Sequence, residues 1–156
     1  FFIQRRSGLD NRSFKLIKFR TMKKNPDADI KQATEQDERI TKFGRFLRKT
    51  SLDEMPQFLN VLIGDMSVVG PRPHMLKHTD EYKVLVKKFM IRHSVKPGIT
   101  GYAQVRGRRG EIKMQGDIKD RIKLDISYIE NWSLWLDIKI ILLTISHFLI
   151  GNRKAY

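Results

Sequence analysis

The sequence predicts a helix-rich α+β fold, and three observations support this. Two short stretches of alternating polar and apolar character flank a polar turn at the N-terminus, which is the pattern of a β-hairpin. Several later segments carry apolar residues at helical spacing, with basic residues on their other faces. The final apolar run has the length and composition of a helix. We therefore expect a short N-terminal β-hairpin packed with several amphipathic helices and a C-terminal interfacial helix.

The N-terminal quarter of the chain contains the predicted hairpin and the first helix. Residues 1–22 read FFIQRR, SGLDNRS and FKLIKFRTM, which predicts two strands around a turn rich in Gly, Asp and Asn. Residues 23–38 are polar and rich in Asp and Lys, which indicates a surface loop. Apolar residues then recur at helical spacing among basic ones, so residues 39–49 predict a basic amphipathic helix.

The middle of the chain predicts a second helix followed by a rigid turn. Residues 56–64 form a helix candidate, with Pro56 near the first turn, where its missing N–H costs little, and Gly64 at the end. Residues 65–75 predict a short buried segment that runs into a Gly-Pro-Arg-Pro turn.

The remaining elements are two helical regions on either side of a loop. Residues 80–93 predict a helix with many lysines. Residues 96–110 are punctuated by glycine, which favours a loop with a short strand. Residues 115–150 are again helical in pattern, with an interruption near NWSLW.

The apolar run LWLDIKIILLTISHFLI closes this helical region. It is about 17 residues long, the lower limit for crossing a bilayer, and it carries Asp137, Lys139 and His147. These features argue against a full membrane span. Two interpretations stay open: a buried core helix, or a helix lying in the bilayer interface and anchored by Trp132 and Trp135.

Composition bounds the class of protein. The 156 residues are most simply a single domain, and the formal net charge of +14 implies an anionic partner. The chain has no cysteine, which excludes disulfides, thiolate zinc sites and a cysteine nucleophile. Because the chain begins at Phe1 rather than at methionine, we expect a fragment or a processed chain.

The adjacent carboxylates of Asp53 and Glu54 are the main candidate for a chemical site. They follow a basic run, and Ser51 with Glu54 matches the spacing of a capping box at a helix start. Alternatively, Pro56 pushes Met55 away from helical angles and so places the pair at a break between two helices. Free N–H groups at the second helix would then keep the carboxylates ionised.

An ionised carboxylate among arginines and lysines is a plausible nucleophile towards phosphorus. The cations offset the repulsion between an anionic attacker and an anionic substrate. A diphosphate needs several such cations, for which Arg20, Arg48 and Arg72 are candidates. A divalent ion, usually Mg²⁺ held by one or two carboxylates and phosphate oxygens, is also expected.

Four motifs occur in fixed order along the chain, and the resemblance to one family that they carry extends over essentially all of its residues. They are KFRTM, RKTSLDEMPQFLNVLIGDMSVVGPRP, VKPGITGYAQVRGR and LDISYIENWSLWLDIKIILLT. Together they resemble the bacterial sugar transferases, the monotopic phosphoglycosyl transferases, and most closely the catalytic C-terminal part of the longer members. The resemblance implies that residues 1–156 are a single catalytic domain, a fragment without the upstream membrane-anchoring segment that family members normally carry. The resemblance implies transfer of a sugar-1-phosphate from a UDP-sugar to undecaprenyl phosphate on the cytoplasmic face of the inner membrane, with release of UMP. This reaction would initiate exopolysaccharide, capsule or O-antigen repeat units.

The resemblance also assigns residues. Asp53 matches the family's nucleophile, which forms an aspartyl-phosphosugar intermediate, and Glu54 matches its partner in Mg²⁺ binding or proton handling; both are candidate Mg²⁺ ligands. Five further positions match substrate-binding or phosphate-binding residues: Arg48, Arg72, Asp125, Lys18 and Arg20. Arg106 departs from the family pattern, where Asn is more usual, so the sugar is not carried over.

Two rival interpretations belong to other classes. A basic nucleic-acid-binding module would bind with a steep salt dependence, but the acidic pair would repel a polyphosphate backbone, so we expect no nucleic-acid partner. A non-catalytic membrane-surface adaptor would be indifferent to loss of the Asp53 carboxylate. Either the adaptor or the enzyme would use an anionic inner-membrane surface as a partner. Homo-oligomerisation is left open by the sequence.

Overall fold

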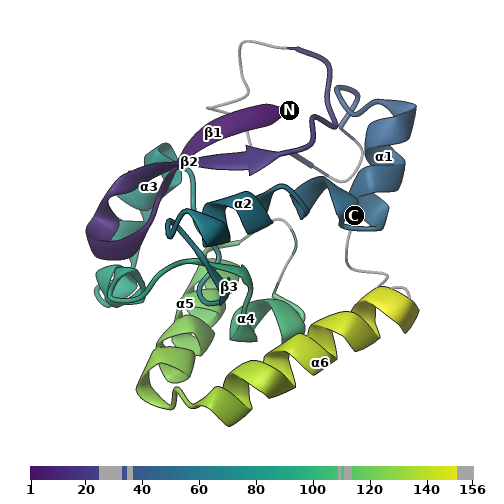
Figure 1. Ribbon diagram of the computed structural model, residues 1–156. Helices are drawn as coiled ribbons and strands as arrows, with labels where there is room; N and C mark the ends of the chain where they lie inside the picture. The colour runs from purple at the N-terminus through teal and green to yellow at the C-terminus, as the bar shows by residue number, and fades with distance from the viewer. Residues whose placement is uncertain (25–32, 35–36, 109, 111–113, 151–156) are drawn as a thin grey trace.

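The structure is a computed structural model, and it describes residues 1–24, 33–34, 37–108, 110 and 114–150. The predicted surface loop at residues 23–38 therefore lies largely outside the described residues. The described chain has the expected helix-rich α+β architecture, with a short strand pair at the N-terminus and helices making up most of the rest. In Figure 1 the N-terminal hairpin and the C-terminal helix α6 lie at opposite sides of the molecule.

The N-terminal hairpin is confirmed. Strand β1 (Phe2–Ser7) pairs antiparallel with β2 (Ser13–Lys18), and a short 3₁₀ turn, η1 (Leu9–Asn11), joins them. Asp10 and Asn11 have positive φ angles of 52° and 58°, which Asp and Asn tolerate better than other side chains. Asp10 and Asn11 therefore form the turn between the two strands, as the sequence predicted.

Three short helical segments follow the hairpin. Helix α1 (Lys42–Lys49) is the predicted basic helix, η3 (Leu52–Glu54) is a single 3₁₀ turn, and α2 (Gln57–Leu62) is the predicted second helix. Gly64 ends α2 with a φ of 88°, the left-handed conformation that glycine adopts without strain.

Helix α1 packs unusually close to the segment after β2. Thr41 caps the helix by accepting a hydrogen bond from the Gly44 N–H at 2.9 Å. A Cβ at Gly44 would lie 1.9 Å from the carbonyl oxygen of Thr21, so only glycine fits there. This contact brings the C-terminal turn of α1, with Arg48, against the end of the hairpin.

A small parallel strand pair supports the proline-rich turn. Strand β3 (Ser67–Val69) pairs with β4 (Gly98–Thr100), a pairing that the sequence did not predict. A Cβ at Gly98 would lie 2.1 Å from the backbone nitrogen of Gly70, so the two backbones touch where the turn begins. The Gly-Pro-Arg-Pro turn leaves β3 from this fixed point.

The predicted helix at residues 80–93 is wrong in its bounds. Helix α3 (Leu76–Leu85) begins earlier and ends earlier, and a separate 3₁₀ helix, η4 (Phe89–His93), follows. The helical conformation ends at Val86, which is extended at φ −133° and ψ 107°. This break turns Phe89 into the core, where it is fully buried.

The C-terminal part contains the short α4 (Tyr102–Val105) and two longer helices. Helices α5 (Gln115–Glu130) and α6 (Leu134–Ile150) are separated near NWSLW, as predicted. None of the helices described is long and apolar enough to span a membrane. Two apolar clusters form the core: one joins α3, η4 and α5, and the other joins β3, α5 and α6.

Candidate active site

The acidic pair lies at the junction between α1 and α2, in the 3₁₀ turn η3. Asp53 and Glu54 are both buried, at 9% and 7% exposure. Ser51 has a φ of 55° and its side chain makes no capping hydrogen bond, so the capping-box interpretation is wrong. A cap residue needs an extended backbone to turn its hydroxyl towards the helix, and the left-handed Ser51 lacks it. The pair does lie between two helices, as expected, but the predicted cause is wrong: Met55 before Pro56 is helical at φ −54° and ψ −38°, and the backbone leaves helical angles at Ser51 instead.

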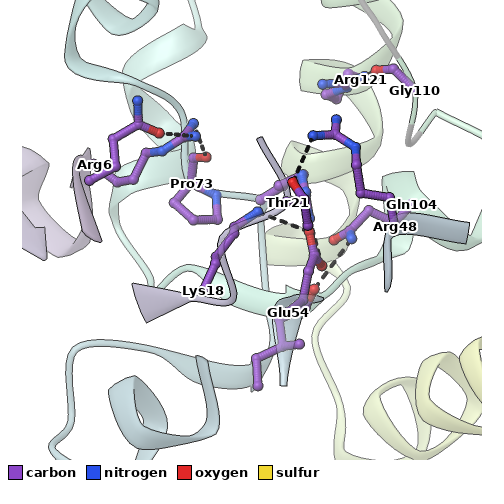
Figure 2. Close-up of polar contacts among 12 residues, drawn as sticks. Arg6, Lys18, Thr21, Arg48, Glu54, Pro73, Gln104, Gly110 and Arg121 are labelled. Atoms are coloured by element: carbon purple, nitrogen blue, oxygen red, sulfur yellow. Dashed lines mark hydrogen bonds and ion pairs between the residues drawn. The ribbon is translucent and has the colours of Figure 1, made fainter. Parts of the chain in front are cut away.

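Glu54 is held by two cations from distant segments. The ammonium of Lys18, at the end of β2, lies 3.0 Å from Oε1 of Glu54. Arg72, from the proline-rich turn, donates from Nη2 to Oε1 at 2.5 Å and from Nη1 to Oε2 at 3.2 Å. Figure 2 shows the Lys18 side chain directed at Glu54. Such a two-pronged arginine–carboxylate pair fixes direction as well as charge.

The charge of Lys18 is itself finely balanced. Burial lowers the pKa of Lys18 to about 8, while Glu54 acts in the opposite direction and Arg72 adds to the lowering. The cationic form of Lys18 therefore depends on the carboxylate that it contacts.

Asp53 differs sharply from Glu54. Its backbone carbonyl accepts a hydrogen bond from the Phe19 N–H at 2.9 Å, which links the hairpin to the acidic dyad formed by Asp53 and Glu54. No hydrogen bond reaches its carboxylate from the described residues. Burial, followed by the neighbouring Glu54 charge, raises the pKa of Asp53 above its usual value. Lys18, Arg48 and Arg72 act against this shift. The expected hydrogen bonds from helix N–H groups to this carboxylate are not formed by the described residues.

The predicted arginines are placed differently from one another. Arg48 approaches the dyad from α1, and its Nη1 donates a long hydrogen bond of 3.4 Å to Oγ1 of Thr21, as Figure 2 shows. Arg20 is exposed, and its guanidinium lies 5.5 Å from the ring centroid of Phe2. The structure thus brings Lys18, Arg48 and Arg72 around the dyad, and turns Arg20 towards the start of the hairpin.

Asp125 is farther inside the molecule than the sequence indicated. It lies in α5 at 2% exposure and pairs with Arg92 at 2.8 Å. Sequence reasoning missed Arg92, as well as the buried Arg121, which donates to the Gly110 carbonyl at 2.8 Å. In a chain with 31 Lys and Arg residues, neither stands out from the surface cations by any local pattern.

The two carboxylates of the site suit Mg²⁺ binding, although they do not supply a complete set of metal ligands. The described residues contain no group of three or more His, Cys, Asp or Glu side chains that could hold a metal. In the described part of the chain no group donates to the Asp53 carboxylate, whereas Glu54 is already balanced by two cations. Mg²⁺ commonly binds one or two carboxylates and completes its shell with phosphate oxygens and water, and the dyad fits that mode.

None of the described residues donates a hydrogen bond to the Asp53 carboxylate, whereas Lys18 and Arg72 neutralise Glu54 beside it, and such a cluster of cations suits an anionic ligand. Comparison with known sequences makes this specific. The chain belongs to the bacterial sugar transferase family, whose model matches residues 1–151.

Three relatives show how closely the chain matches. The UDP-glucose:undecaprenyl-phosphate glucose-1-phosphate transferase of Xanthomonas campestris pv. campestris is 54% identical over 158 residues, covering 100% of this chain and 32% of the relative. The protein of the same name from Escherichia coli (strain K12) is 50% identical, covering 99% and 33%. A UDP-N-acetylgalactosamine-undecaprenyl-phosphate N-acetylgalactosaminephosphotransferase of Aeromonas hydrophila is 43% identical, covering 96% and 35%. The chain thus spans about a third of the length of these curated relatives.

Proposed function

We propose that this protein transfers a sugar-1-phosphate from a UDP-sugar to undecaprenyl phosphate through a covalent intermediate on Asp53. The observation that carries the proposal is the contrast within the dyad: Glu54 is engaged by Lys18 and Arg72, while the buried Asp53 carboxylate accepts no hydrogen bond from the described residues. An acid that is both positioned and free of hydrogen bonds is suited to attack.

In the first step the Asp53 carboxylate attacks the phosphorus that bears the sugar. A bond forms between Asp53 and that phosphorus, the bond from phosphorus to the bridging oxygen breaks, and UMP leaves. Lys18, Arg48 and Arg72 surround the dyad and stabilise the negative charge that builds up on the phosphoryl oxygens. Mg²⁺, when bound by Asp53 or Glu54, supplies further neutralisation of the diphosphate.

In the second step a phosphate oxygen of undecaprenyl phosphate attacks the aspartyl-phosphosugar. The new bond gives the polyprenyl-diphosphate sugar, and cleavage of the bond to Asp53 restores its carboxylate. The two substrates then need not be bound together, which removes a geometric conflict between a soluble donor and a membrane-held acceptor.

The C-terminal helix supplies the surface for the membrane-held acceptor. Leu136, Ile140 and Thr144 of α6 face the protein. Apolar side chains on the other side are exposed at helical spacing: Leu134, Ile138, Leu142, Ile145 and Leu149. Trp132 and Trp135 are also exposed, at 60% and 80%. An apolar stripe flanked by tryptophans is typical of helices in a bilayer interface, and the net positive charge favours the anionic cytoplasmic face of the inner membrane.

UMP release is the direct test. The membrane-bound protein is incubated with Mg²⁺, undecaprenyl phosphate and a series of UDP-sugars, beginning with UDP-glucose because several relatives are named for that donor. We expect UMP to appear together with a polyprenyl-diphosphate sugar. Absence of UMP with every common UDP-sugar, or full activity in Asp53→Asn, contradicts the proposal.

Trapping the intermediate tests the covalent route separately. Without undecaprenyl phosphate, one hexose phosphate is expected on the peptide that contains Asp53, detectable by mass. Subsequent addition of the acceptor removes the added mass and yields the lipid product. A lag-free transfer that never labels this peptide contradicts the covalent step but leaves the overall reaction standing.

A further inference from the structure

Arg92 and Asp125 form an ion pair in the interior of the molecule. Their side chains are 2% and 3% exposed, respectively, so the pair is as deep as the apolar core around it. Both Nη2 and Nε of Arg92 donate to Oδ2 of Asp125, at 2.8 and 3.1 Å. Arg92 comes from η4 and Asp125 from α5, so the pair also joins two elements.

Stability alone does not account for this pair. Removing two charges from water is costly, and an apolar pair of similar volume is often as stable or more stable. Burial raises the pKa of Asp125, with the Arg92 charge acting against it. A buried pair of this kind is better explained by its effect on a third group, which it contacts and holds in one conformation.

That third group is the backbone of Arg72. Nη2 of Arg92 also donates to the carbonyl oxygen of Arg72, at 2.6 Å. The Arg72 side chain, in turn, makes the two-pronged contact with Glu54. A continuous chain of polar contacts thus runs from Asp125 through Arg92 and Arg72 to the acidic dyad.

The turn that carries Arg72 is fixed on both sides as well. The carbonyl of Pro71 accepts from the Gly98 N–H at 3.0 Å. The carbonyl of Pro73 accepts a long hydrogen bond of 3.5 Å from Nη1 of Arg6, which Figure 2 shows. The ring of each proline restricts its own φ angle. Between the two prolines, the peptide at Arg72 can still change its orientation, and the hydrogen bond from Arg92 restrains it.

We propose, on the basis of the function proposed above, that Arg92 is a positioning residue for sugar-1-phosphate transfer. Asp125 orients Arg92, which donates a hydrogen bond to the Arg72 carbonyl. This contact holds the Arg72 guanidinium towards Glu54 and the reacting phosphate. Asp125 then acts through Arg92 and does not touch the substrate, which differs from the phosphate-site role that the family resemblance indicated for it.

A double-mutant cycle on UMP release tests this chain of contacts. Arg92→Lys keeps the charge but loses the planar fork that reaches Asp125 and Arg72 together. We expect kcat/KM to fall about 10- to 100-fold, the range for small misplacement of a group at a reacting centre. In an Arg72→Ala background the same change is expected to have less than about a threefold further effect, because Arg92 acts only through Arg72.

The matched control is a second two-pronged arginine–aspartate pair, formed by Arg39 and Asp37, which lie two residues apart in the sequence. Arg39 donates to Asp37 at 2.6 Å from Nη2 and 2.8 Å from Nε. Arg39→Lys is expected to leave kcat/KM within about twofold of the parent. Equal effects of Arg92→Lys and Arg39→Lys, or an undiminished effect of Arg92→Lys in the Arg72→Ala background, overturn the proposal.

The role of Asp125 is resolved by the same assay. Asp125→Asn is expected to cost about as much as Arg92→Lys, and combining the two to cost little more. If Asp125 contacts the substrate directly, its loss remains costly in the Arg92→Lys background. The pair Arg92→Met with Asp125→Leu, which replaces the ions by apolar groups, is expected to stay folded by thermal denaturation and still lose activity.

A readout independent of activity separates this proposal from the proposed function. The Nε–Hε signal of Arg72 is followed by nitrogen-15 NMR of the protein in lipid nanodiscs, and it is assigned by its loss in Arg72→Lys. We expect Arg92→Lys to shift or broaden it and Arg39→Lys to leave it in place. If the parent releases no UMP but this pattern holds, the function fails and the positioning stands; an unchanged signal in Arg92→Lys overturns the positioning.

Discussion

The acidic dyad and the outer face of α6 depart from the usual arrangement of globular proteins in opposite ways. At the dyad the protein buries charge: Asp53, Glu54 and the ion pair behind them are all less than a tenth exposed. On α6 the protein exposes apolar surface, with Trp135 at 80% and Leu142 at 61%.

Each departure indicates a different kind of function. Buried charges are costly unless they are paired, so a carboxylate kept inside without a hydrogen bond points to chemistry at that atom. A row of exposed apolar side chains is costly unless something covers it, so it points to a surface or a partner. Under the proposed function, the contrast separates the proposed reaction site from the proposed membrane-contacting surface, and each can be altered without the other.

Asp53→Asn is expected to have the largest effect. UMP release should fall about a thousandfold or more, because the amide cannot serve as the nucleophile. The raised pKa of Asp53 gives a second expectation by its sign. Ionising Asp53 is less favourable in the folded chain than in the unfolded one, so the melting temperature at neutral pH should stay level or rise. Loss of activity together with a marked fall in melting temperature would indicate a structural role instead.

Arg72→Lys should have the next largest effect on the buried side of the comparison. Lysine keeps one positive charge but cannot make the two-pronged contact with Glu54. We expect kcat/KM for UMP release to fall about 10- to 100-fold. The control is Arg45→Lys on the exposed face of α1, which should change the rate by less than about twofold. Equal rates for the two variants would contradict the role of Arg72.

The exposed side of the comparison is tested by replacing Trp135 and Leu142 together with serine. Binding of the purified chain to anionic vesicles, measured by co-sedimentation, should weaken about tenfold or more, because two large apolar side chains no longer enter the interface. The melting temperature in solution should hardly change. Val84 and Leu85 of α3, exposed at 81% and 44%, provide a matched pair whose replacement by serine should leave vesicle binding intact.

The smallest expected effect concerns acid stability. Burial lowers the pKa of His74 well below its usual value, and burial lowers that of His93 to about 4. The unfolded chain binds protons at these residues below about pH 6.5, while the folded chain does not. The free energy of unfolding should therefore fall as pH drops below 6.5, by at most about 1.4 kcal/mol per pH unit for each histidine that stays neutral in the folded chain. His74→Phe should flatten this slope in urea titrations, and an unchanged slope would contradict the assignment.

Sequence motifs and hydrophobic periodicity predicted many of the helices and strands. The hairpin, the basic helix, α2 and the break before α6 follow from local patterns that the structure confirms. The parallel pairing of β3 with β4 did not follow, because three-residue strands have too little periodicity to recognise and their partners are far apart in sequence. The break at Val86 was missed for a related reason, since the pull of Phe89 into the core is a tertiary effect.

The candidate site shows the same limit. The sequence singled out Asp53, Glu54 and Arg72, and the structure brings them together, although their catalytic roles stay predictions. Arg92 could not be found, because burial is what distinguishes it and composition hides one arginine among many. The left-handed backbone at Ser51 was equally hidden, because a Ser with Glu three residues later normally indicates a cap.

The backbone hydrogen bond from Phe19 to Asp53 gives the site a built-in reporter. The hairpin cannot separate from the junction of α1 and α2 without breaking this bond, and the nearby contact of Lys18 with Glu54 would open with it. The exchange rate of the Phe19 amide hydrogen with solvent therefore measures how often the junction that carries Asp53 and Glu54 comes apart during local opening. A substrate that closes the site should slow that single amide, even when the global unfolding free energy is unchanged.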